Sequence, residues 1–230
     1  MKSKFLIYIV FLMTACSQSQ NPEHICKDCK TFDLAKVTYQ EDIQELTAKA
    51  EIFKIAIVNE SNQEKRVEEV TDSDKVKLYK YRFLDEEGLF EENPISYDNK
   101  FFFDGLTVLT DAEDNIQAFS TTTFYDGKME DIEKFIVYMK KKYSNFHFEE
   151  HTLRGGMPLY RWTSDDEIIQ IVSDKEEGTE IRFDENGKET EVSSTHISLT
   201  IYGKSFIENN IKEWVENNSE FLIYEEQSYE

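Results

Sequence analysis

Residues 75–83 alternate charged and apolar side chains, broken only at Leu78-Tyr79, which is the period of a β-strand with one buried face. Residues 194–202 repeat this period, with Ile197, Leu199 and Ile201 on one side. On a helix these apolar residues would spread around every face, so the chain must place them on a sheet. Because strands and helices do not alternate regularly along the sequence, the pattern predicts an antiparallel sheet.

Other apolar or alternating runs, separated by turn-forming segments, predict the remaining strands of this sheet. They lie at residues 52–58, 101–109, 116–125, 146–149, 159–163, 168–172, 180–183, 190–192 and 221–224. The Asn186-Gly187 pair tolerates positive φ and predicts a hairpin at that point. Residues 59–75 and 85–100 are rich in charge and are predicted to be loops.

Three segments carry apolar residues at helical spacing. A capping-box sequence that begins at Thr38 predicts a helix over about residues 39–50, and one that begins at Ser205 predicts a helix over about residues 207–215. Residues 129–143 have acidic side chains at their start and lysines at their end, which suits the helix dipole. The predicted fold class is α+β, an antiparallel β-sheet with about three helices packed on one face.

Two similar sequences, residues 123–128 and residues 200–204, each end a predicted strand and open a predicted helix. An internal duplication would explain the similarity, and so would repeated use of one turn chemistry. The similarity is too short to divide the chain further. Residues 35–230 are therefore predicted to form a single globular domain.

The chain has 26 basic and 47 acidic side chains among 230 residues, and a net charge of −21. Such an excess of negative charge argues against non-specific nucleic-acid binding, because phosphate would be repelled. The 17 Phe and 12 Tyr residues argue for a packed core rather than disorder. Three cysteines are too few for a disulfide-dense scaffold.

A short basic start, residues 1–4, precedes an apolar run at residues 5–13 that is too short to span a bilayer. Small residues then lead to Cys16, and a polar run follows it. This arrangement resembles the signal peptide and lipobox of bacterial lipoproteins. The resemblance implies that residues 1–15 are cleaved, that Cys16 carries acyl chains that bind the membrane, and that Ser17 favours the outer membrane of the cell envelope.

Residues 16–34 are polar, lack a strong period and are predicted to be a lipidated flexible tether. Within them, Cys26 and Cys29 form a C-x-x-C pair. A local disulfide is the leading interpretation, since the cell envelope is oxidising. A redox pair, a metal site completed by His24 and two free thiols remain open.

The chain lacks the motifs of familiar enzymes, including the Gly-x-Ser-x-Gly nucleophile elbow and the phosphate-binding loop. On a strand, His147, Glu149 and His151 share a face, yet the outer pair would lie about 13 Å apart. One metal ion could not bridge all three, so a solvated polar face is preferred. Residues 111–115 offer oxygen ligands but lack the glycine and glutamate of an EF-hand loop, and a hairpin turn is preferred. No metal site or cofactor is predicted.

Tyr160, Arg161 and Trp162 are the candidate partner surface, because exposed aromatic residues and arginine are enriched where proteins bind one another. Packing against the sheet is the competing interpretation for Tyr160 and Trp162. The leading hypothesis for function is a membrane-anchored envelope lipoprotein that is not an enzyme. Its acidic domain would dock a protein partner of basic character, in an assembly, inhibitory or immunity role. An enzyme or metal-dependent protein of unfamiliar type, or a redox or metal role for the cysteine pair, is the alternative.

Overall fold

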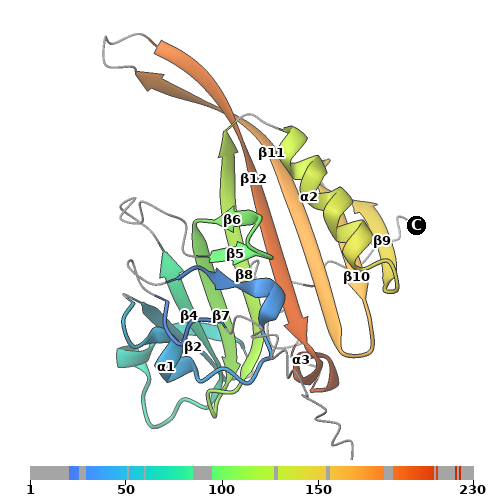
Figure 1. Ribbon diagram of the computed structural model, residues 1–230. Coiled ribbons are helices and arrows are strands. Elements are labelled where there is room, and N and C mark those ends of the chain that lie inside the picture. The colour runs from blue at the N-terminus through green and yellow to red at the C-terminus, as the bar shows by residue number, and fades with distance from the viewer. Residues whose placement is uncertain are drawn as a thin grey trace, which may run out of the picture.

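The computed structural model describes residues 21–25, 30–50, 52–59, 61–84, 95–126, 129–153, 156–183 and 189–209, with residues 211, 221 and 223. Over these residues the chain builds a nine-stranded antiparallel sheet (Figure 1) in the order β3-β2-β4-β7-β8-β12-β11-β10-β9. Its strands are β2 (Phe53–Val58), β3 (Gln63–Arg66), β4 (Val76–Leu84), β7 (Gly105–Asp111), β8 (Ile116–Asp126), β9 (His147–Thr152), β10 (Pro158–Thr163), β11 (Glu167–Phe183) and β12 (Glu189–Gly203).

The sheet consists of two four-stranded units, β2-β4-β7-β8 and β9-β10-β11-β12, which join where β8 pairs with β12, and β3 adds a ninth strand at the edge beside β2. A small second sheet holds β1 (Phe32–Asp33), β5 (Ile95–Tyr97) and β6 (Phe101–Phe103). The α-helices are α1 (Ile43–Thr47), α2 (Met129–Lys142) and α3 (Lys204–Glu208), with short 3-10 helices η1 (Leu34–Lys36) and η2 (Val67–Glu69). In this part of the chain no helix is both long and apolar enough to cross a bilayer.

The predicted antiparallel sheet is confirmed, but strands dominate the fold more than an even α+β balance implies. The helices also lie on both faces of the sheet rather than on one. Helices α1 and α2 belong to the larger core with Ile197, Leu199 and Ile201. Helix α3 belongs to a second core, in which the Phe206 and Tyr202 rings lie 4.7 Å apart. Successive residues of β12 point to opposite faces, so one strand serves both cores.

Helix α2 is the helix that the sequence predicted best, because its apolar stripe and its charged ends both indicate a helix over the same residues. Ile132, Phe135, Ile136 and Met139 are buried in the larger core, whereas Val137 on the outer side is 66% exposed. Three lysines occupy its last turn. The helix lies across one face of the sheet, over the second four-stranded unit (Figure 1).

Helix α1 is shorter than predicted and begins four residues later. Tyr39 has a φ of 62°, which a right-handed helix cannot accommodate. Asp42 is the N-cap, and its carboxylate accepts hydrogen bonds from the backbone N–H groups of Gln44 and Glu45. The C-terminal helix α3 spans residues 204–208, and residues 210 and 212–215 of the predicted helix lie outside the described part of the chain.

The segment that the sequence analysis assigned to a flexible tether is partly built into the fold. Ile25, Phe32 and Leu34 are among the buried core residues, and Asp33 is buried beside them. Strand β1 pairs in parallel with β5. These apolar side chains enter the core one at a time, so they leave no helical or strand period in the sequence. Cys16 and the Cys26–Cys29 pair lie outside the described residues.

Two segments predicted to be loops contain strands. Within residues 59–75 lies the exposed edge strand β3, whose polar residues give no apolar signal. Within residues 85–100 lies β5, which is buried in the small sheet. The predicted run at residues 101–109 is two strands of two different sheets, β6 and β7, separated at Asp104. The predicted Asn186-Gly187 turn lies outside the described residues.

The two similar sequences at the ends of β8 and β12 place their equivalent threonines on opposite faces of the sheet. Thr123 pairs with Ile197 on the face of the larger core, whereas Thr200 pairs with Ser120 on the other face. A duplication around the β8–β12 junction would place equivalent residues on the same face. The geometry therefore favours shared turn chemistry as the origin of the similarity.

Candidate functional site

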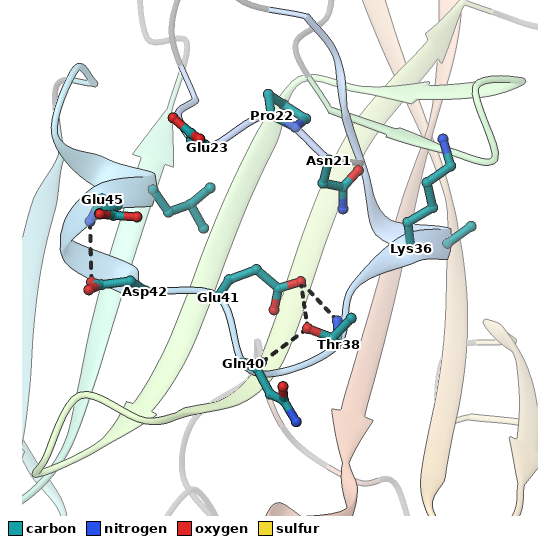
Figure 2. Close-up of a pocket in the computed structure, with 11 residues that line it drawn as sticks. Asn21, Pro22, Glu23, Lys36, Thr38, Gln40, Glu41, Asp42 and Glu45 are labelled. Atoms are coloured by element: carbon teal, nitrogen blue, oxygen red, sulfur yellow. Dashed lines mark hydrogen bonds between the residues drawn. The ribbon is translucent and has the colours of Figure 1, made fainter. Parts of the chain in front are cut away.

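A cavity of about 930 Å³ opens between the N-terminal segment and α1. Figure 2 shows the side chains around it. They are Asn21, Pro22, Glu23, Ala35, Lys36, Thr38, Gln40, Glu41, Asp42, Glu45 and Leu46. Cavities of this size accept small molecules or the side chains of a docked protein. We call this feature the acidic pocket.

Hydrogen bonds to the backbone of α1 hold the two walls of the acidic pocket together. The Ile25 N–H donates to the Leu46 carbonyl at 3.0 Å, and the His24 ring nitrogen Nδ1 lies 2.6 Å from the Glu45 carbonyl oxygen. On the floor, the Thr38 N–H donates to Glu41 Oε1 at 2.8 Å. This bond is half of the predicted capping box, formed without the helix that was expected to follow.

The charge of the acidic pocket is strongly negative. Glu23, Glu41, Asp42 and Glu45 line it, and Lys36 is the one cation among the lining residues. The Lys36 Nζ already lies 3.1 Å from a carboxylate oxygen of Asp33. Within the described structure, Glu41 Oε2 is buried without a hydrogen-bond partner. The pocket therefore favours a positively charged group over an anion.

Asp33 fastens the pocket's inner wall to the rest of the fold. Its carboxylate accepts hydrogen bonds from the Asp98 N–H at 2.6 Å and from Asn99 Nδ2 at 3.1 Å. The Asn21 amide bridges both backbone groups of Asp33, with bonds of 3.0 and 3.1 Å. A fully buried carboxylate needs such partners. The N-terminal segment is thus fixed to the β5–β6 turn.

The face of the sheet turned away from α1 and α2 carries a row of polar side chains that are direct cross-strand neighbours. In spatial order these are Arg82, Thr107, Ser120, Thr200, Gln170, Arg161 and Glu149. We call them the polar row. Ser120 and Thr200 share a hydrogen bond of 3.1 Å, and Arg161 donates to Gln170 Oε1 at 3.3 Å. These two bonds satisfy buried polar groups of Ser120, Thr200 and Gln170.

The structure separates the three residues of the predicted partner surface. Trp162 is completely buried against Phe148, with ring centroids 5.2 Å apart, and it cannot contact a partner. Tyr160 packs half-buried against the same core. Arg161 points to the other face and lies 3.5 Å from a carboxylate oxygen of Glu149. Strand alternation, which sends neighbours to opposite faces, explains the separation.

The residues considered as metal ligands have other roles. His147 lies 3.6 Å from Glu149 on the exposed side of edge strand β9. In the turn at residues 111–115, the Asp111 carboxylate accepts the Asn115 N–H at 2.8 Å, which closes the β7–β8 hairpin. Among the residues that the structure describes, no group of three or more His, Cys, Asp or Glu side chains is placed to hold a metal ion.

A cluster of tyrosines joins the N-terminal segment, the end of α2, β5 and the start of β11. No sequence motif predicted this cluster. The Tyr39 hydroxyl donates to Glu167 Oε1 at 3.2 Å, and the Tyr97 and Tyr143 hydroxyls share a short hydrogen bond. Burial raises the pKa of the Glu167 carboxyl and raises the pKa of Tyr143 to about 12. Burial lowers the pKa of Lys142, whose Nζ lies 4.6 Å from the centre of the Tyr97 ring.

Comparisons with known proteins gave no assignment. No protein-family model, no curated protein and no solved structure matches this chain. A functional interpretation therefore depends on the geometry of the acidic pocket and on the charge of the chain.

Proposed function

We propose that this protein is a lipid-anchored lipoprotein of the bacterial cell envelope whose acidic domain docks a basic protein partner without catalysing a reaction. The resemblance of residues 1–20 to a lipoprotein signal peptide and lipobox supports the anchor at Cys16, with the outer membrane favoured. The net charge of −21 supports rapid, charge-steered capture of a positively charged partner.

The acidic pocket is the observation that carries the proposal. Its carboxylates outnumber its single lysine, which is already paired with Asp33. A lysine or arginine side chain of a partner would therefore meet several carboxylates and no free cation within this pocket. Docking of this kind is strengthened at low ionic strength and weakened by salt.

The experiment captures the partner from an envelope extract with mature protein that carries Cys16→Ser. A pocket variant, Glu23→Gln with Glu45→Gln, removes two exposed carboxylates that line the cavity. A control variant, Glu133→Gln with Asp165→Asn, removes two exposed carboxylates elsewhere and makes the same change in net charge. We expect one stoichiometric partner, released by salt, whose affinity falls about tenfold in the pocket variant and stays close to wild type in the control.

Equal binding of the partner to both variants would place docking outside the acidic pocket. The absence of any salt-sensitive partner would contradict the proposal as a whole. Circular dichroism of each variant establishes that a loss of binding does not reflect a loss of fold.

A further inference from the structure

Strands β11 and β12 continue together beyond the rest of the sheet (Figure 1). Strand β10 pairs with β11 only as far as Val172, and β8 pairs with β12 only from Ser194. Past these points, Thr179 to Phe183 pair with Glu189 to Ser193 and with no other described strand. At about 3.4 Å per residue, this two-stranded extension is about 17 Å long. We call it the β11–β12 arm.

The β11–β12 arm begins at an irregularity in the pairing. Between Asp174 and Gly178 the register shifts, because four steps along β11 correspond to two steps along β12. Extra residues of this kind bend a strand and increase its twist. The arm therefore leaves the sheet as a distinct element, and no other strand in the described ranges pairs with it.

An isolated two-stranded ribbon is marginally stable in water. Among the described strands none pairs with either outer edge of the arm, and an edge of this kind presents backbone N–H and C=O groups that can template the addition of another strand. The sequence from residue 173 to residue 195 has eight acidic and three basic residues. This charge opposes pairing with the arm of a second copy, because like charges would come together, and it favours a basic strand.

We propose that the β11–β12 arm binds an extended, basic segment of a partner protein, which adds as a third strand along the outer edge of β12. The added strand continues the line that β8 occupies up to Asp126. Backbone hydrogen bonds supply the affinity, and the excess of acidic residues between 173 and 195 supplies the preference for positive charge. The inference goes beyond the proposed function and rests on it, since it gives the basic partner a second contact outside the acidic pocket.

The test uses a defined probe, a ten-residue peptide that alternates lysine and valine. A second peptide of equal charge has prolines in place of three valines, which removes N–H donors and prevents strand pairing. We expect the first peptide to bind the mature Cys16→Ser protein at least tenfold more tightly than the second. On binding, amide hydrogen exchange should slow at residues 189–193.

Two variants locate the binding edge. In the first, residues 179–193 are replaced by Asn-Gly, so that Gly178 and Ser194, which already pair, are joined by a two-residue turn. In the second, Glu189→Lys and Glu191→Lys reverse the charge of the edge. Both should weaken peptide binding at least tenfold. The control Glu68→Lys with Glu69→Lys makes the same charge change on exposed η2 and should bind normally.

Equal binding of the two peptides, or unchanged binding by the shortened arm, would overturn the inference. Concentration-dependent self-association through the arm would also overturn it, because the occupant would then be a second copy. Capture of the natural partner separates this result from the proposed function, because it is repeated with the acidic-pocket variant and with the shortened arm. A partner lost from the acidic-pocket variant but kept by the shortened arm would contradict the arm alone.

Discussion

At the scale of the residue, the fold depends on a few close contacts between distant parts of the chain. Gly203, at the end of β12, is one of them. A Cβ placed there would lie 2.8 Å from a carbon of the Tyr39 ring. The Tyr39 ring also packs against Phe119, with centroids 5.8 Å apart. The close approach lets the N-terminal segment lie directly on the end of β12.

Gly203→Ala should therefore destabilise the protein by about 1–3 kcal/mol through overpacking. Tyr39→Ala removes the ring that would clash, so the double variant should cost less than the sum of the two single variants. Urea denaturation of the three variants and the wild type measures this coupling. Strict additivity of the two costs would show that the contact does not form.

A second residue, Glu167, gives the stability a characteristic dependence on pH. Burial raises the pKa of this carboxyl, although Tyr39 and Lys142 act in the opposite direction. A group whose pKa is higher in the folded state binds protons more tightly there, so ionising it costs stability. The wild type should thus lose stability as pH rises from about 4.3, the ordinary pKa of glutamate, to the raised folded value.

Glu167→Gln removes this cost, because glutamine stays neutral and its side-chain oxygen can still accept the Tyr39 hydroxyl. The variant should match the wild type near pH 4 and exceed it in stability at neutral pH. Thermal denaturation at a series of pH values tests this expectation. A constant difference between the two proteins at every pH would contradict it.

At the scale of the element, helix α2 and helix α1 show what the sequence could and could not predict. The stripe from Ile132 to Met139 repeats for several turns, so its period alone located α2. Helix α1 has a single turn, and its start depends on the positive φ of Tyr39 rather than on a repeated pattern. The position of a short helix is therefore determined by local backbone geometry, which the spacing of apolar residues does not reveal.

The two sides of α2 should differ sharply in their tolerance of truncation. Phe135 is buried among Tyr97, Phe101 and Phe103, with ring centroids 4.4 to 6.0 Å away. Phe135→Ala should cost about 3–5 kcal/mol, because it leaves a cavity that the core cannot close. Val137→Ala, on the exposed side, should change stability by about 0.5 kcal/mol or less. Urea denaturation distinguishes these values, and similar costs would contradict the assignment of the faces.

At the scale of the whole molecule, the sequence predicted the antiparallel sheet because alternation is a property of each strand by itself. The order of the strands depends on contacts between segments that are far apart. Phe32 and Ile95, for example, are partners in a parallel pair that no local pattern indicates. The acidic pocket escaped prediction for the same reason, since its walls form only when the N-terminal segment folds onto α1.

The proposed lipid anchor makes a separate prediction for the whole chain. Cells that express the wild type in the presence of labelled palmitate should yield a labelled protein in the membrane fraction. Cys16→Ala should remove the label and leave the protein out of that fraction, because an acidic body has no affinity of its own for anionic lipid. An unlabelled wild type, or a Cys16→Ala variant that stays with the membrane, would contradict the anchor.

The attachment of Asn21 to Asp33 sets a limit on how far the body can stand from the bilayer. Those hydrogen bonds make residue 21 part of the folded domain, so only five peptide steps separate it from the proposed acylated Cys16. Fully extended, five residues span at most about 18 Å. The folded body can then pivot about this short attachment, but it cannot move far from the membrane. The limit applies to residue 21, so the folded body stays at the membrane surface and a partner must reach that surface to bind it.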